Sequence, residues 1–483
     1  MLKSPILIRL SPILVLFSFL LAGCGSQPTS TPLEKVYGIS GKSYCDELNK
    51  GFNNALQVHL TQNETQKEKL YTEALLQTLD HVYISIVQIK GNPTSLQNDY
   101  VRLKKTLTPL ESGTLANFHH ITDCSDLIQI GNFYVEQLNS NLIYAQPELF
   151  WSFLSHFAIS LDANSRYEPP AKYVALRLST KGPRVFFMDR KWPDKNSNVH
   201  IEGISTDTIH VTLEKFSKDS AKNLRENILE KVSELKAADQ SLQAKDIKII
   251  LDLRSNMGGN LDELLMIVNF FFSEGEIGKM KSRFEELPLI INPKFDHDFS
   301  ENPLIVLINN FSASASEMLS LVLQETGRAK IVGETSFGKL VGQSLIFNFE
   351  NFEPEKHLGG SLAITSEFFY GPLGVSLQLL GVEPDYEIKD IKWEKFKQTS
   401  QSVDSSAILK EKDLSKFGLK TIETGKNVKE TMNQAKVSFQ VEFSSDKDLQ
   451  KRAEEESAST RNSDVVLSAA KILFRDSKII RAK

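Results

Sequence analysis

The sequence predicts an α/β (α+β) domain with a mixed, mainly parallel sheet covered by helices. Short apolar runs alternate with amphipathic helical segments between residues 204 and 388, which is the pattern of strands buried on both faces. Residues 36–165 have a helical pattern instead, and residues 390–483 are mostly polar. We therefore expect a separate N-terminal helical domain (36–165), a central α/β domain (166–389) and a small C-terminal lobe or accessory region (390–483).

The first residues have the features of a secretion signal. Lys3 and Arg9 precede an apolar stretch over about residues 10–22, which is too short for a comfortable transmembrane helix. Its end, LAGC, resembles the lipoprotein cleavage box of bacteria. We expect residues 1–23 to be a removed signal peptide, Cys24 to be lipidated and residues 24–35 to be a flexible tether. An ordinary apolar anchor is the alternative.

A lipid on Cys24 would hold the protein at a membrane of the bacterial cell envelope, facing the periplasm or the exterior. In that compartment Cys45 and Cys124 could form a disulfide in the N-terminal domain, or they could stay as two buried free thiols. The net charge of −5 gives no indication of nucleic-acid binding.

The N-terminal domain reads as several helices. Residues 61–64 have the form of a capping box, and the apolar face that follows ends at Gly91-Asn92-Pro93. Further helical patterns cover residues 127–142 and 149–159. His119, His120 and Asp123 have no further ligands at matching spacing, so we predict no metal site there.

The regular structure of the central α/β domain begins with a strand over 208–213 and a helix over 216–235. A buried strand (247–253) then leads to the glycine pair Gly258-Gly259 and to a helix that Asn260 would cap. Residues 273–303 read as a polar insertion. Asp296, His297 and Asp298 within it are adjacent in a loop and cannot all face one ion unaided, so no metal is predicted.

The stretch 302–343 reads as strand, tight turn, helix, strand and glycine loop. The predicted strand is 304–308, the helix starts at Ala315 and ends near Gly327, and the second strand is 329–332. Strands over 344–349 and 361–365 would follow, with the sheet ending near Ile388. Beyond it we expect one strand over 437–443 and a helix over 465–474.

Two reactive side chains fall at strand ends in this stretch. Ser314 would lie at a helix amino end, where free amides favour negative charge. Lys339 follows Gly338 and could act as a general base if it is desolvated. A helix cap and a solvated loop lysine are the ordinary alternatives.

Three motifs resemble the C-terminal processing peptidase (tail-specific protease) family of serine endopeptidases. They are SASASE at residues 312–317, GETSFGKLVGQ at 333–343 and DLRSNMGG at 252–259. The resemblance implies that Ser314 is the nucleophile, that Lys339 is the general base and that Gln343 orients the lysine. It also implies an oxyanion hole from the amides of Ala315 and either Gly258 or Gly259, with no metal and no organic cofactor.

The chain departs from the family pattern in two ways. After LDANSRY (161–167), which resembles the end of the family's helical region, only residues 168–207 precede the next strand, too few for the usual PDZ domain. Met257 and Leu340 also stand where the family commonly has Pro and Gly.

The resemblance therefore predicts a serine endopeptidase that cleaves extracytoplasmic proteins or peptides. An adaptor lipoprotein is a further candidate partner. The alternative is a catalytically silent, lipid-anchored binding or scaffold protein that keeps the fold.

Overall fold

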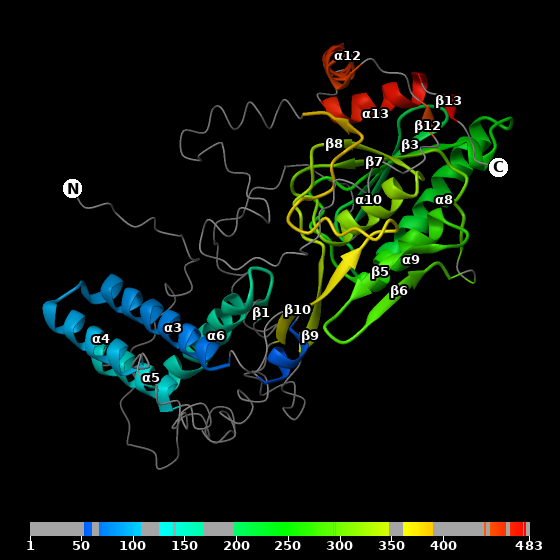
Figure 1. Ribbon diagram of the computed structural model, residues 1–483. Helices are drawn as coiled ribbons and strands as arrows, with labels where there is room; N and C mark the ends of the chain where they lie inside the picture. The colour runs from blue at the N-terminus through cyan, green and yellow to red at the C-terminus, as the bar shows by residue number, and fades with distance from the viewer. Residues whose placement is uncertain are drawn as a thin grey trace. The chain divides into compact units, whose positions relative to one another are not determined.

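The computed structural model describes residues 53–59, 67–107, 125–138, 142–168, 198–346 without 293 and 295, 361–389, 439–440, 445–459, 464–476 and 478–479 (Figure 1). The chain divides into two compact units. One comprises Met1–Asp189 and Ser344–Ile364, and the other comprises Arg190–Gln343 and Thr365–Lys483. Each unit is described by itself.

The first unit is mainly helical, as the sequence predicts. Its helices are α3 (Lys67–Lys90), α4 (Thr94–Leu107), α5 (Ser125–Leu138) and α6 (Leu142–Leu161). They enclose one apolar core that includes Leu75, Leu79 and Phe157. Helix α3 ends directly before Gly91, where the sequence places the stop, whereas α4 is not among the predicted helices. The short strand β1 (Arg166–Glu168) pairs antiparallel with the first residues of β10 (Ser361–Tyr370).

The second unit is built on a six-stranded sheet with the order β11-β8-β7-β4-β3-β2. All neighbouring pairs are parallel except the antiparallel pair β2–β3, so the predicted mixed, mainly parallel sheet is confirmed. The strands are β2 (Val199–Gly203), β3 (Thr208–Leu213), β4 (Lys248–Asp252), β7 (Leu304–Ile308), β8 (Lys330–Gly333) and β11 (Tyr386–Glu387).

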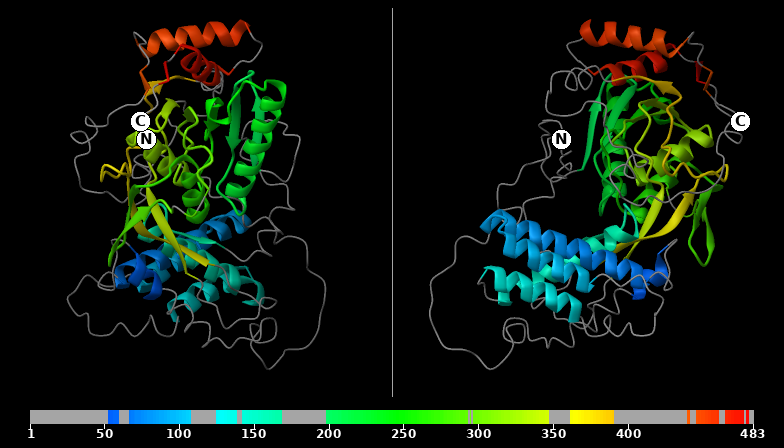
Figure 2. Two further views of the ribbon diagram at one scale, coloured as in Figure 1. Left: turned by 90° about the vertical axis from the view of Figure 1, so that its right-hand side faces the viewer. Right: turned by 60° about the vertical axis from the view of Figure 1, so that its left-hand side comes forward.

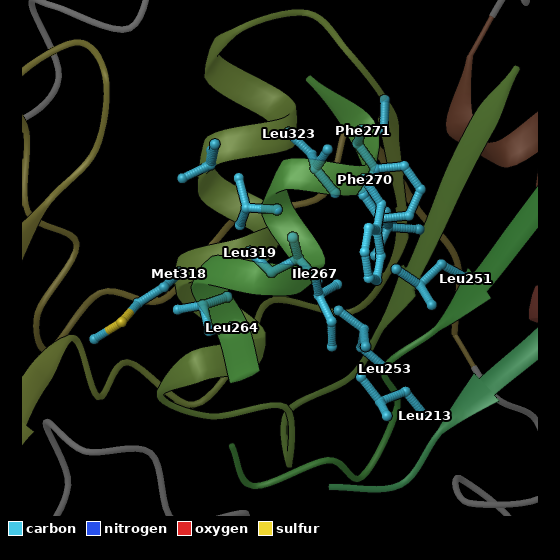
Figure 3. Close-up of a cluster of buried hydrophobic side chains, with 14 of the residues drawn as sticks. Leu213, Leu251, Leu253, Leu264, Ile267, Phe270, Phe271, Met318, Leu319 and Leu323 are labelled. Atoms are coloured by element: carbon cyan, nitrogen blue, oxygen red, sulfur yellow. The ribbon is translucent and has the colours of Figure 1, made fainter. Parts of the chain in front are cut away.

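Three helices cover one face of this sheet: α8 (Ser220–Ala238), α9 (Leu261–Phe271) and α10 (Ala315–Glu325). A short 3-10 turn, η5 (Ala244–Asp246), precedes β4. Figure 3 shows Leu264 and Ile267 of α9 and Leu319 of α10 in this core with Leu251 of β4. Asn260 caps α9 as predicted, since its side chain accepts hydrogen bonds from the amides of Asp262 and Glu263.

The opposite face of the sheet is covered by the C-terminal part of the chain. Helices α12 (Asp446–Ser459) and α13 (Val465–Asp476) lie side by side, and α13 contacts β7 and β8 (Figures 1 and 2). Ile250, Ile305 and Val332 point to this face and share a buried cluster with Leu473 and Phe474. Alternate residues of β4 and β7 are thus buried on opposite faces, which gives a three-layer helix–sheet–helix arrangement.

The predicted polar insertion at 273–303 contains two strands. Strands β5 (Glu276–Lys281) and β6 (Glu286–Ile290) form an antiparallel hairpin. β5 also pairs with the end of β10, which pairs with β9 (Val341–Ile346). The sequence analysis places no strand in this segment, so the hairpin is a finding of the structure. The sequence signal is weak because β6 is exposed over most of its length and contains Pro288, so it lacks the apolar alternation of a half-buried strand.

The end of the chain follows the prediction in part. Helix α13 covers the predicted 465–474. A two-residue strand, β12 (Phe439–Gln440), falls inside the predicted 437–443 and pairs with β13 (Lys478–Ile479).

Several predictions concern residues outside the described ranges. They include the signal peptide, Cys24, Cys45, Cys124, His119, His120, the capping box and most of the segment where a PDZ domain would lie. They and the domain boundaries stay predictions. In the part of the chain that the structure describes, no helix is long and apolar enough to cross a membrane.

Candidate active site

Ser314 occupies a tight turn between β7 and α10. Its backbone has φ 57° and ψ −118°, a conformation that a residue with a Cβ rarely adopts and that surrounding contacts must hold in place. Parallel strands β7 and β8 both end at the same edge of the sheet, so the turn after β7 and the loop after β8 meet there. The local strain thus falls on the residue that sequence reasoning selects as nucleophile.

The three serines of residues 312–317 have different surroundings. Ser312 is fully buried and donates to the carbonyl oxygen of Leu253 at 2.8 Å, and Ser316 is fully buried and donates to the carbonyl oxygen of Asn256 at 2.8 Å. Ser314 is half-buried. The hydroxyls of Ser312 and Ser316 are thus bound to backbone carbonyl oxygens shortly before the Gly258-Gly259 pair. Ser314 is the serine of this motif whose side chain is accessible.

Lys339 lies in the loop after β8, and Gln343 lies in β9. The Lys339 Nζ donates to Gln343 Oε1 at 3.1 Å, so the pair is brought together as the sequence predicts. This hydrogen bond limits the rotamers available to the Lys339 side chain. Next to the lysine, the amide of Leu340 donates to Gln378 Oε1 at 2.6 Å, which ties the Lys339 loop to the segment that follows β10.

Glu317 connects the Ser314 turn to the Lys339 loop. Its Oε2 accepts hydrogen bonds from the amides of Ser314 and Lys339, both at 2.8 Å. Its Oε1 accepts from the Ser336 hydroxyl and from the Gly338 amide, both at 2.6 Å. The two candidate catalytic residues therefore have their backbone amides on one carboxylate oxygen. Sequence reasoning noted Glu317 as part of a motif but gave it no role.

The Glu317 carboxyl is fully buried. Burial raises the pKa of Glu317 to about 7, and the four hydrogen bonds oppose this shift because they favour the charged form. A carboxylate that accepts four donors has all its principal lone-pair directions occupied. Removing the charge would leave some of these donors without an acceptor.

The glycine pair packs against two different neighbours. A Cβ on Gly258 (φ 91°) would lie 2.8 Å from the Ala315 amide nitrogen and 2.8 Å from Ser314 Cβ, whereas one on Gly259 (φ 149°) would lie 2.0 Å from the Phe216 carbonyl oxygen. Glycine is therefore required at both positions. The Gly258 amide already donates to Asn256 Oδ1 at 2.8 Å. Within the described residues the Gly259 amide has no hydrogen-bond acceptor.

The glycine loop and the Ser314 turn are joined through their backbones. The carbonyl of Asn256 accepts from the Ala313 amide at 3.0 Å. Ser255, at φ 62°, donates its amide to Asn309 Oδ1 at 2.8 Å. Two strained residues, Ser255 and Ser314, thus lie in loops that hold each other.

Asp296, His297 and Asp298 each have other partners in the structure. Asp296 and Asp298 both pair with Arg225, and His297 Nδ1 lies 2.9 Å from the Asn269 carbonyl oxygen. Among the described residues no group of three or more His, Cys, Asp or Glu could hold a metal ion. His210 is buried and lies between the Asp252 and Glu202 carboxylates.

The fold and these loops belong to a known class of hydrolase domain. Residues 207–388 match the family model of Peptidase family S41 and form a peptidase S41 domain. The described catalytic loops, from Asp252 to Gln343, all fall inside the matched segment.

The relatives of the chain are proteases. It is 37% identical over 170 residues to the carboxy-terminal-processing protease of Bartonella bacilliformis, which covers 34% of this chain and 37% of that protein. It is 32% identical over 144 residues to the tail-specific protease of Haemophilus influenzae, covering 30% of this chain and 20% of that protein. The match thus spans about a third or less of these relatives.

A solved structure, titled photosystem II D1 C-terminal processing protease, resembles the chain at 15% identity with a TM-score of 0.37, covering 65% of this chain and 93% of that one. The score is too low to support conclusions about this chain.

Proposed function

We propose that the protein is a serine endopeptidase that uses Ser314 and Lys339 as a catalytic dyad. The observation that carries this proposal is the Glu317 carboxylate, which binds the amides of both residues while Lys339 Nζ contacts Gln343. The S41 domain and the protease relatives support the reaction class.

In the proposed reaction Ser314 Oγ attacks a peptide carbonyl carbon, and neutral Lys339 takes the hydroxyl proton. The lysine then gives that proton to the leaving amine, and an acyl-enzyme remains on Ser314. In the second half Lys339 removes a proton from water while the water oxygen attacks the acyl carbon. The lysine then gives this proton to Ser314 Oγ as the acyl–Oγ bond breaks, which releases the acid and restores the serine. Gln343 keeps the lysine directed during both transfers.

The negative oxygen of the tetrahedral intermediate needs two donors. Ala315 is the first residue of α10, so its amide has no partner within the helix. For the second donor we favour Gly259 over Gly258, since the Gly258 amide is already bound to Asn256. Gly258 would instead let the loop approach the nucleophile.

The proposed substrates are unstructured proteins or peptides outside the cytoplasm, reached from a lipid anchor on Cys24 at a membrane of the cell envelope. An adaptor lipoprotein remains a candidate partner. The relatives' printed names concern carboxyl-terminal processing and tail-specific cleavage, and such end specificity is not assumed for this chain.

The test compares purified wild-type protein with Ser314→Ala and Lys339→Ala on an unfolded casein substrate. We expect both variants to lose cleavage by at least about 10³-fold while they unfold at nearly the wild-type temperature. Lys279→Ala is the matched control, because Lys279 is a partly exposed lysine paired with Glu286 on the hairpin, and it should cleave at the wild-type rate.

A fluorophosphonate label provides the second measurement. It should modify wild-type Ser314 and leave Ser314→Ala unmodified. Cleavage by Ser314→Ala at the wild-type rate would contradict the proposal. A folded wild-type protein that neither cleaves nor reacts with the label would favour the silent scaffold.

A further inference from the structure

The glycine loop is connected to the C-terminal helix α13 by a buried ion pair. Arg254 Nη1 and Nη2 donate to Asp464 Oδ1 and Oδ2 at 2.9 and 2.8 Å, a bidentate contact. The same guanidinium binds Asp252, with Nε 2.9 Å from Oδ1. Both the Arg254 and Asp464 side chains are 11% exposed, so water does little to screen the pair.

Asp464 holds the start of α13 as well as the arginine. Its Oδ1 accepts from the Leu467 amide at 3.0 Å, so the arginine is attached to the helix amino end. Burial alone would raise the pKa of Asp464, but the Arg254 charge outweighs it and lowers the pKa to about 2. The carboxylate is therefore charged throughout the pH range in which proteins are usually assayed.

Arg254 begins the loop that carries the candidate oxyanion glycines. The next residue, Ser255, is in a strained conformation, and such conformations persist only when contacts on both sides hold them. Asn309 binds the Ser255 amide on one side. Arg254, held between Asp252 and Asp464, fixes the chain on the other side. The following Asn256 positions Gly258 and contacts the Ser314 turn.

The geometry points to α13 as a working part of the active site: Asp464, acting through Arg254, is a positioning residue that keeps the Met257–Gly259 backbone in the conformation that presents the oxyanion amide. Asp464 lies outside the matched segment 207–388. The catalytic role of this loop rests on the proposed peptidase function, whereas its positioning by Asp464 can be measured without any turnover.

The main variant is Asp464→Asn in the full chain, which keeps the shape and removes the charge. Asp464→Glu is the conservative variant. Asp476→Asn is the matched control, since Asp476 pairs with Arg452 and Arg475 within the same helix pair and makes no contact with Arg254 among the described residues.

The first readout is hydrogen exchange of the 253–260 peptide, measured by mass spectrometry, and it does not depend on activity. We expect exchange to be about 10-fold faster in Asp464→Asn, close to wild type in Asp464→Glu and unchanged in Asp476→Asn. Unchanged exchange in Asp464→Asn would overturn the inference.

The second readout is cleavage kinetics on an unstructured peptide. We expect Asp464→Asn to lower kcat by about 10- to 100-fold with KM within about twofold, since a small misplacement of oxyanion donors acts on the transition state. Asp464→Glu should recover most of kcat. A kcat within twofold of wild type in Asp464→Asn would overturn the inference.

The double variant Arg254→Gln/Asp464→Asn tests whether Asp464 acts through Arg254. If it does, the double variant should be no slower than Arg254→Gln alone. Losses that multiply would contradict the inference. If Asp464→Asn does not fold, Arg254→Lys, which keeps a cation but lacks the bidentate fork, replaces it with the same expected results.

The two proposals fail in distinguishable ways. If wild type shows no Ser314-dependent cleavage, the peptidase function fails, and the exchange experiment still decides the positioning of the loop. If wild type cleaves and Asp464→Asn changes neither readout, only the role of α13 fails.

Discussion

Glu317 accepts hydrogen bonds from the amides of Ser314 and Lys339, the two residues of the candidate dyad. Removing its charge should therefore affect both catalysis and stability. Glu317→Gln would direct an NH2 group toward backbone amides that are themselves donors. We expect kcat to fall by at least about 10²-fold and the free energy of unfolding to fall by about 2–4 kcal/mol. Urea denaturation and peptide cleavage measure the two effects.

Glu263→Gln is the matched control for this prediction. Glu263 is also buried and accepts two backbone amides, those of Asp219 and Ala221 at 2.8 Å, neither of which belongs to the Ser314 turn or to the Lys339 loop. It should lose stability and keep kcat. Equal kcat losses in both variants would mean that Glu317 acts only on folding.

At this scale the sequence points to the candidate catalytic residues more readily than to the residues that position them. Ser314, Lys339 and Gln343 lie in recognisable motifs with fixed spacing. The partners of Glu317 depend on how the loop after β8 returns to α10, and Asp464 meets Arg254 across 210 positions of sequence. Neither contact has a local sequence pattern. The backbone amides that Glu317 binds place no demand on residue type, and the Arg254–Asp464 ion pair joins residues that are far apart in the sequence.

Helix α10 carries a second unusual acid at its other end. Glu325 is buried, its Oε2 accepts from the Leu373 amide at 2.8 Å, and its Oε1 has no partner among the described residues. Burial raises the pKa of Glu325 from its ordinary value of 4.5 to about 7. The protonated form is therefore the one that the folded protein prefers.

The sign of the pH effect follows from this shift. A folded-state pKa above the unfolded value contributes stability below pH 4.5, and that contribution is lost as pH rises through about 7. Glu325→Gln is neutral at every pH, so its stability relative to wild type should rise by about 3 kcal/mol between pH 4 and pH 8. Urea denaturation at several pH values measures this, and a constant difference would contradict the assigned pKa.

The elements themselves were predictable where both faces of a strand are buried. Residues 304–308 and 208–213 were predicted as strands and are β7 and β3. The hairpin β5–β6 was missed because most of β6 faces solvent. Apolar periodicity in a sequence arises from burial of one face, so an exposed edge strand such as β6 shows little of it.

At the scale of the whole molecule, the C-terminal helices are a layer of the catalytic unit. Cutting the chain after residue 389 would expose the apolar face formed by residues such as Ile250, Ile305 and Val332. We expect the shortened protein to aggregate and to show no Ser314 labelling. Solubility and fluorophosphonate labelling of the two lengths measure this.

A control for the truncation is residues 440–483 supplied as a separate chain. If the lost layer causes the defect, this piece should restore part of the solubility of the shortened protein. A soluble, labelled protein that ends at residue 389 would show that α12 and α13 are dispensable.

The layer formed by α12 and α13 can pack on the sheet only after the rest of the second unit has been synthesised. Synthesis delivers the chain from its amino end, so the loops that carry Gly258 and Ser314 emerge well before α13, which starts at Val465. During that interval the sheet has one bare face and Arg254 lacks Asp464. A peptidase built in this way would remain inactive while its own unfolded chain is still close by, and it would become competent only after α13 has been made and has packed on the sheet.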